Sequence, residues 1–241
     1  MAKLYVDTIE PEGATTNLAI GESGQDVILP GNDIRANVLQ DAGGNAIFTS
    51  NGSGTLSGVN SAFGDDLKLL STNTVSNGAA AEFTSGLTST YNEYIFTFLN
   101  VNPATDNEYF VFQTSTDGGS SYGLNCVTTY CYAYHNIADT TAAMTFHAAN
   151  SADNIDTNII LAHSVGGGAS EGLSGEMHFF NPSSATLVKN FWCRIQMYEQ
   201  SDYSEDVYIG GYYNTASDID AIKFYFSSGN MDGIVKMYGV A

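Results

Sequence analysis

The side chains best suited to binding a ligand lie in residues 189–199, where a tryptophan, an arginine and a tyrosine alternate with apolar residues. Successive side chains of a β-strand point to opposite faces of the sheet. The better apolar set, which we expect to face the core, is Phe191, Cys193, Ile195 and Met197. Trp192, Arg194 and Tyr198 then face outward, where aromatic rings can stack on a sugar or pack against protein and a guanidinium can pair with a carboxylate.

An outward tryptophan beside Arg194 and Tyr198 is unusual on the surface of a soluble protein. Trp192 can belong to a platform that stacks on the sugars of a receptor, to a contact with a neighbouring subunit, or to a surface that its own chain covers. We favour the subunit contact, because trimeric jelly rolls bury flat aromatic faces around their axis. The three residues are therefore the candidate contact surface.

Acidic side chains gather before two later segments that we predict as strands. Asp202, Glu205 and Asp206 precede one segment, and Asp218 and Asp220 precede the next. Oxygen atoms from two neighbouring loops can supply the several ligands that Ca²⁺ takes in proteins. The alternative, which we favour, is a solvated acidic rim without a bound ion. We expect no other cofactor.

We expect no enzyme, because the sequence analysis identifies no nucleophile elbow, no His-Glu-x-x-His motif and no phosphate-binding loop. The four histidines have no metal-ligand spacing and are predicted to be structural or on the surface: His135, His147, His163 and His178. The odd number of cysteines argues against a disulfide framework. All three are interpreted as small buried apolar residues: Cys126, Cys131 and Cys193.

The charge of the chain excludes some classes of partner. It carries 26 acidic and 7 basic residues, a formal net charge of −19. Nucleic-acid binding needs a basic surface, so we expect no nucleic-acid partner. The sequence also has no signal peptide at its start and no long apolar run, so we expect no Sec export and no membrane insertion. The net charge is read as an aid to solubility, with divalent-cation binding as the alternative.

Alternation with a period of two residues dominates the chain after residue 64 and predicts strands. The candidate strands are residues 67–76, 81–84, 93–101, 108–114, 127–135, 157–162, 175–180, 189–199, 207–214, 221–227 and 234–239. About ten short strands without helices predict an all-β sandwich or barrel, and a jelly roll is the commonest arrangement of that number. We place this head domain at residues 65–241.

Residues 1–64 have a different composition. They hold three of the chain's aromatic residues, against 26 in the rest of the chain, and they are rich in glycine. So few large apolar side chains bury too little surface to offset the entropy of ordering the segment alone. We therefore expect an extended arm of short strands that forms trimers and docks on a partner. The candidate contact residues of this arm are Leu4, Val6, Ile9, Leu18 and Ile20.

Several stretches of the sequence resemble one family of proteins. Residues 1–11 (MAKLYVDTIEP) and 41–54 (DAGGNAIFTSNGSG) resemble the N-terminal attachment segments of structural proteins of marine tailed bacteriophages. Residues 226–240 (FSSGNMDGIVKMYGV) look like the last two strands of the C-terminal jelly-roll modules of these proteins. Residues 109–121 and 179–183 fit the same family. The resemblance implies a virion protein that is assembled in the host cytoplasm.

Together, these observations predict a homotrimer that binds other virion proteins of the tail or the capsid. The preferred function is a short tail fibre or spike whose head contacts a glycan or protein of the host surface. The alternative is a capsid decoration protein of the head-fibre or cement type, because the chain has almost no shaft between arm and head. A glycan-degrading tailspike is the third hypothesis, since 26 acidic residues allow many carboxylate pairs.

Overall fold

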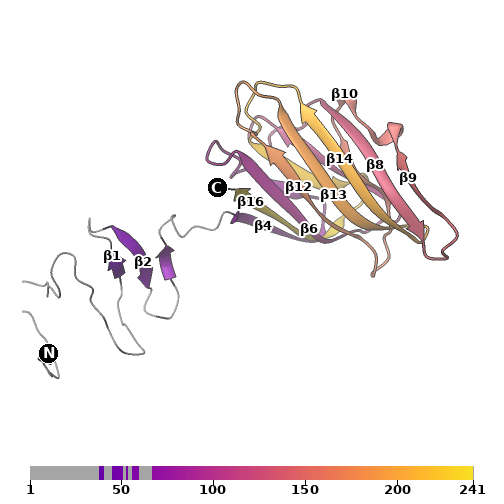
Figure 1. The fold of residues 1–241 in the computed structure, drawn as a ribbon, viewed down its shortest axis with the longest axis horizontal. Coiled ribbons are helices and arrows are strands. Elements are labelled where there is room, and N and C mark those ends of the chain that lie inside the picture. The colour runs from indigo at the N-terminus through magenta and orange to yellow at the C-terminus, as the bar shows by residue number, and fades with distance from the viewer. Residues whose placement is uncertain (1–37, 41–44, 51–52, 54–55, 60–66, 241) are drawn as a thin grey trace, which may run out of the picture. The chain divides into compact units, whose positions relative to one another are not determined.

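The structure is a computed structural model that describes residues 38–40, 45–50, 53, 56–59 and 67–240 (Figure 1). The chain divides into two compact units, Met1–Phe63 and Gly64–Ala241. This division lies one residue from the boundary that composition predicts. The predicted contact residues of the arm lie outside the described residues: Leu4, Val6, Ile9, Leu18 and Ile20. Their role remains a prediction.

The described part of the first unit is a small antiparallel sheet. It contains β1 (Val38–Gln40), β2 (Ala46–Ser50) and β3 (Leu56–Val59), in the order β1-β2-β3. Leu39 lies opposite Phe48, and Phe48 lies opposite Val59. These strands have three to five residues each, in agreement with the short strands predicted for this segment.

The second unit consists of strands joined by turns and loops. In chain order they are β4 (Leu67–Gly78), β5 (Ala81–Phe83), β6 (Glu93–Pro103), β7 (Glu108–Ser115), β8 (Cys126–Asn136), β9 (Ala142–Phe146), β10 (Asp153–Asp156), β11 (Ile159–Val165), β12 (Leu173–Phe180), β13 (Lys189–Glu199), β14 (Tyr203–Tyr213), β15 (Ala221–Phe226) and β16 (Met231–Val240). A 3₁₀ turn, η2 (Ala148–Asn150), lies between β9 and β10. The predicted all-β fold is confirmed, with thirteen strands in this unit where about ten were expected.

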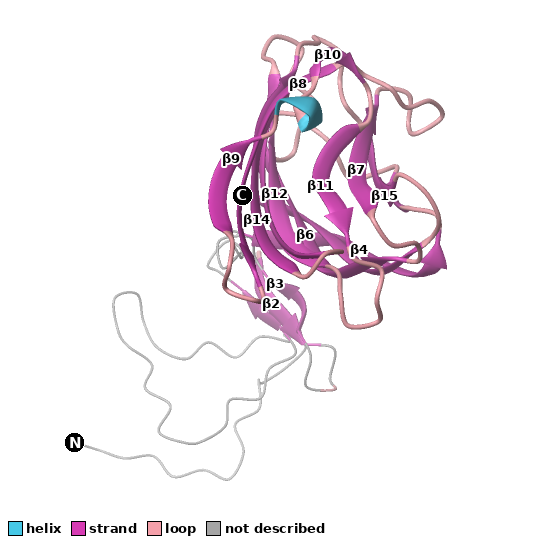
Figure 2. Ribbon diagram, turned by 90° about the vertical axis from the view of Figure 1, so that its right-hand side faces the viewer, coloured by secondary structure: helices cyan, strands magenta, loops and turns pink. Residues whose placement is uncertain are grey.

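Eight of these strands have the connectivity of a jelly roll. One sheet has the order β4-β16-β6-β12 and the other has the order β11-β7-β15-β5. If only these eight strands are numbered along the chain, the first (β4) pairs with the last (β16), and the second (β5) pairs with the next to last (β15). This is the pairing of two Greek keys. Figure 2 shows the two sheets packed face to face.

The other five strands enlarge only one of the two sheets. β13 and β14 follow β12 in the sequence, whereas β8, β9 and β10 come between β7 and β11. In space, β13 pairs with β12, β14 pairs with β13, and β8 pairs with β14 and also with β9 and β10. The enlarged sheet connects to the smaller one at a single residue pair between β13 and β11, Glu199 and Val165. The inserted strands therefore extend past the smaller sheet.

The core lies between the two sheets and is rich in phenylalanine. Phe224 of β15 contacts rings from both sheets, with centroid distances of 5.2 Å to Phe96, 5.1 Å to Phe98 and 6.1 Å to Phe112. All four rings are fully buried or nearly so. Edge-to-face and offset contacts of this kind stabilise an aromatic core beyond the burial of its area.

Candidate functional site

The candidate contact surface lies on the outer face of the enlarged sheet. In β13 the buried and exposed residues alternate, with the set that contains Phe191 inside. Antiparallel pairing places Trp192 between His178 of β12 and Gly210 of β14. The next outward residue, Arg194, lies between Glu176 and Tyr208. Neighbouring strands thus bring together side chains that are far apart in the sequence.

The indole of Trp192 is held by an imidazole. The ring centroids of Trp192 and His178 are 3.9 Å apart, and the ring planes meet at 15°. His178 Nδ1 lies 2.5 Å from Glu93 Oε1, and its Nε2 lies 3.7 Å from Glu176 Oε1. The hydrogen bond with Glu93 orients the imidazole, and the imidazole orients the indole that stacks on it. Trp192 nevertheless remains 38% exposed.

Arg194 belongs to a compact polar cluster with Asp206 and Tyr208. Its Nε and Nη2 atoms donate to the two carboxylate oxygens of Asp206 at 3.0 and 2.8 Å. The Tyr208 hydroxyl donates to Asp206 Oδ2 at 2.7 Å, and the guanidinium carbon lies 5.2 Å from the Tyr208 ring centroid. The hydrogen bonds from Arg194 lower the pKa of Asp206. A bidentate pair of this kind orients both side chains.

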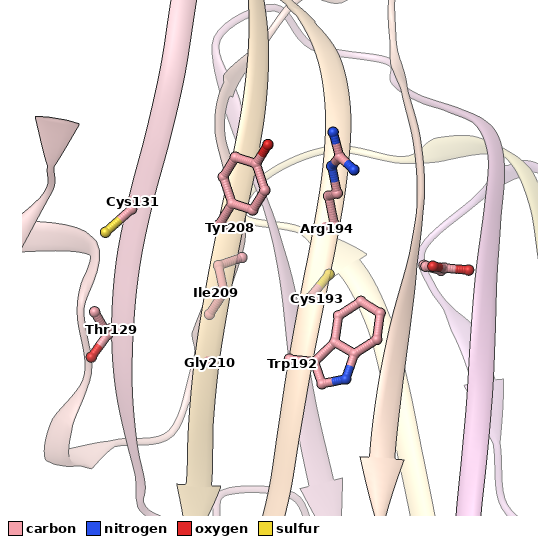
Figure 3. Close-up of a pocket in the computed structure, with 9 residues that line it drawn as sticks. Thr129, Cys131, Trp192, Cys193, Arg194, Tyr208, Ile209 and Gly210 are labelled. Atoms are coloured by element: carbon pink, nitrogen blue, oxygen red, sulfur yellow. The ribbon is translucent and has the colours of Figure 1, made fainter. Parts of the chain in front are cut away.

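A shallow hollow of about 610 Å³ lies next to these residues (Figure 3). Its lining residues are Thr129, Cys131, Glu176, Trp192, Cys193, Arg194, Tyr208, Ile209 and Gly210. Gly210 is responsible for part of the space, because a Cβ atom there would have no neighbour within 4 Å. The flat indole therefore borders a gap in the surface, into which a side chain of a partner can insert.

The same face continues as an apolar surface on β9. Antiparallel pairing places Phe146 opposite Cys131, and Met144 opposite Ala133. Phe146 is 57% exposed and Met144 is 70% exposed. The sequence analysis did not find this strand, although Met144 and Phe146 alternate with polar or small residues. The contact surface therefore extends beyond the predicted residues onto β9, and the part on β9 is the more apolar one.

Tyr198 lies at the end of β13, away from the hollow. Its hydroxyl donates to Asp202 Oδ1 at 2.5 Å, and this bond raises the pKa of Tyr198. It faces outward as parity predicts, but it is absent from the residues that line the hollow. The structure thus brings Trp192 and Arg194 together at the hollow. The tyrosine beside them is Tyr208 of β14, where the sequence predicted Tyr198.

The five predicted calcium ligands do not form one site, which corrects that hypothesis. Asp202, Glu205 and Asp206 are not in one loop, because β14 starts at Tyr203 and turns Glu205 inward and Asp206 outward. Asp220 accepts from the Gly118 amide at 2.9 Å, and burial, followed by the charge of Asp220, raises the pKa of Asp218. Within the described residues, no three His, Cys, Asp or Glu side chains are grouped to hold a metal ion.

Two further features of the molecule differ from the expectations drawn from its sequence. Cys126 and Cys193 are buried, but Cys131 is only partly buried and lines the hollow; all three are free thiols. Residues 168–172 (GASEG) also match the Gly-x-Ser-x-Gly pattern, which the sequence analysis did not report. They lie between two strands, β11 and β12, so the strand-to-helix turn that makes a serine a nucleophile is not present there.

Comparison of the chain with protein-family models, curated proteins and solved structures found no match. Across the part of the chain that the structure describes, no helix has the length and apolar character to span a membrane.

Proposed function

We propose that this chain is the subunit of a homotrimeric phage virion protein, a short tail fibre or spike whose jelly-roll head projects from the virion. One observation supports this proposal most strongly: the outer face of the enlarged sheet exposes a rigid aromatic surface around Trp192. Large exposed apolar surfaces on soluble proteins mark interaction sites. The resemblance of several sequence stretches to phage structural proteins supports the same reading.

The geometry of the contact surface favours a protein partner. The ionic groups of Arg194 and Asp206 already satisfy each other, and His178 already has Glu93, so these groups need no ligand to pair with. Three features remain available to a partner: the exposed part of the indole, the hollow beside Gly210, and the apolar side chains of Phe146 and Met144. A hydrophobic centre with a satisfied polar border is the usual anatomy of a protein interface. We assign this face to contacts between subunits.

The capsid decoration protein remains the second candidate. One observation favours it: β3 ends at Val59 and β4 begins at Leu67, so no long shaft separates the two units. The copy number in the virion distinguishes the two functions. Labelling the protein in virions and counting copies by electron microscopy should give a few to tens of copies for a tail protein. Hundreds of copies would favour the capsid.

A glycan-degrading tailspike is the least favoured function. Incubation of the full chain with host envelope polysaccharide tests it directly. We expect no release of reducing ends, and steady release would replace our proposal with an enzymatic one.

A further inference from the structure

A second candidate site lies on the opposite, inner face of the enlarged sheet. Here β8, β13 and β14 form a groove of about 260 Å³, away from the outer hollow. Its lining residues are Tyr132, Tyr134, Glu199, Ser201, Tyr203 and Glu205. Three tyrosine rings and two carboxyl groups thus share a small space. The proposed function uses none of them.

The tyrosines form two walls that meet nearly at a right angle. The rings of Tyr132 and Tyr134 are stacked, with centroids 5.6 Å apart and planes at 28°. The rings of Tyr134 and Tyr203 meet edge to face, with centroids 5.7 Å apart and planes at 74°. The face of an aromatic ring carries partial negative charge, so a ring face that is open to the groove would attract a cation.

Glu205 is a buried carboxyl group of the groove with an oxygen atom that no hydrogen bond from the described residues satisfies. It is 4% exposed, and within the described residues its Oε2 atom has no hydrogen-bond partner. The nearest candidate, His163 Nε2, is 3.6 Å away, which is too far for a hydrogen bond. The other ring nitrogen of His163 is bonded to the Tyr130 hydroxyl at 2.9 Å. A buried carboxyl oxygen without a partner is costly, so we expect something to bind next to it.

The two carboxyl groups of the groove have no positive counter-ion among the described residues when they ionise. None of its lining residues is basic. Three basic side chains of the second unit have partners elsewhere: Lys189 contacts backbone carbonyls, Arg194 pairs with Asp206, and Lys223 lies over Tyr122 and Tyr225. Burial lowers the pKa of His163 to about 4, so its ring is neutral at pH 7. The two carboxyl groups, Glu199 and Glu205, therefore face each other without a cation.

We propose that this groove binds an alkylated ammonium group, with the tyrosine rings around the cation and Glu205 as its counter-ion. Aromatic faces attract organic cations, and pockets that recognise quaternary ammonium groups combine such rings with carboxylates. A neutral sugar would also stack on tyrosine, but it would give an ionised Glu205 no counter-ion. Charge complementarity therefore selects the cation. This inference does not depend on the proposed virion function.

The proposal predicts a specific dependence on pH. Burial, and secondly the charge of Glu199, raises the pKa of Glu205 to about 8, so this carboxyl is mostly protonated at pH 7. A bound cation favours the ionised form, so binding at pH 7 releases a proton. The affinity should rise about tenfold between pH 7 and pH 9, because the ionised fraction of Glu205 rises by that factor. Four titratable groups among the described residues interact with Glu205, namely Tyr130, Tyr132, His163 and Glu199; Tyr134 and Tyr203 line the same groove, and His147 packs behind His163.

The test is a titration of the full chain with tetramethylammonium chloride and with choline chloride at pH 7 and pH 9, followed by NMR of the tyrosine rings. Sodium chloride at equal ionic strength is the control for screening. We expect both cations to bind, with tighter binding at pH 9. Glu205→Gln, which keeps the shape of the side chain, should weaken binding at pH 9 at least tenfold and remove its pH dependence. Tyr212→Ala, a tyrosine on the outer face of β14, should change neither.

Each other outcome has a defined meaning. Absence of binding by both cations at pH 9, or binding that Glu205→Gln leaves unchanged, overturns the proposal. Shifts of Tyr132 and Tyr134 produced by glucose but by neither cation would also overturn it and assign the groove to sugars. Phosphatidylcholine vesicles carry the same ammonium group on a lipid, so co-sedimentation with these vesicles, compared with phosphatidylglycerol vesicles, identifies a lipid head group as the source. Binding of free choline alone identifies a small soluble ligand.

Discussion

Trp192 and His178 lie face to face across β12 and β13, with ring centroids 3.9 Å apart. This pair explains how a large aromatic side chain can remain exposed and still have one fixed orientation. The imidazole is itself held by Glu93, so the order of the surface extends over three strands. A side chain that is fixed before association loses little entropy when a partner covers it. This property favours Trp192 as the centre of an interface.

The first prediction concerns Trp192 itself. Trp192→Ala should weaken trimer formation by about 2–4 kcal/mol, as the loss of a central aromatic anchor does in other interfaces. Sedimentation at a series of concentrations measures this change, with Tyr109→Ala, at a similarly exposed tyrosine on β7 of the smaller sheet, as the matched control. Normal trimers that no longer adsorb to cells would assign Trp192 to a receptor. Normal trimers with normal adsorption and a lower melting temperature would show that Trp192 only stabilises its own subunit.

A second prediction tests the ion pair beside the hollow. Asp206→Asn should lower the free energy of unfolding by less than about 1 kcal/mol, because the pair with Arg194 is on the surface. The pKa of Asp206 is lowered in the folded protein, so this stabilisation is present above the ordinary aspartate pKa and is lost as the pH falls through the folded value. Urea unfolding at pH 7 and at pH 3 should therefore show a smaller difference between wild type and variant at pH 3. An equal difference at both pH values would contradict the assignment.

Glu205 gives a prediction with the opposite sign. Its pKa rises from 4.5 to about 8 on folding, so folding becomes less favourable as the pH increases through this interval. The expected loss is at most about 4–5 kcal/mol, at about 1.4 kcal/mol for each pKa unit. Urea unfolding between pH 5 and pH 8.5 should show this decline in the wild type and a flatter profile for Glu205→Gln. Identical profiles would show that Glu205 is not buried.

Two glycines provide a matched test of the strand register. A Cβ atom on Gly175 would overlap the Arg194 carbonyl oxygen and lie 2.8 Å from the Ile195 Cα atom, whereas one on Gly210 would meet nothing within 4 Å. Gly175→Ala should lower the free energy of unfolding by about 1–3 kcal/mol. Gly210→Ala should change it by less than about 0.5 kcal/mol. Thermal melts of the two variants measure the difference, and equal melting temperatures would reject the pairing of β12 with β13.

Much of the fold was predictable because its signals are local. The alternation in residues 189–199 is complete, and the structure has the same buried and exposed positions. Two strands of the second unit that were not predicted, β9 and β10, depend on tertiary contacts. β9 begins with two alanines, which have low strand propensity, and it forms because β8 offers it a free edge. The placement of β8, β13 and β14 as an extension of one sheet has no local signal at all.

The candidate sites were predictable only in part for the same reason. Trp192 and Arg194 could be placed outward from parity, but their neighbours His178 and Tyr208 come from other strands. The acidic residues Asp202, Glu205 and Asp206 were predicted to precede a strand that begins at residue 207, and acidic residues are depleted in strands. In the structure Glu205 and Asp206 belong to β14, where the alternation of Tyr203, Glu205 and Val207 turns Glu205 inward. That alternation was the signal that could have revealed the inner groove.

The central claim is that this chain forms a trimer, and sedimentation equilibrium of the full 241-residue chain tests it most directly. We predict a single species with three times the subunit mass of 25.7 kDa at micromolar concentration. A monomer at the same concentration, with the exposed face around Trp192 free in solution, would contradict the account.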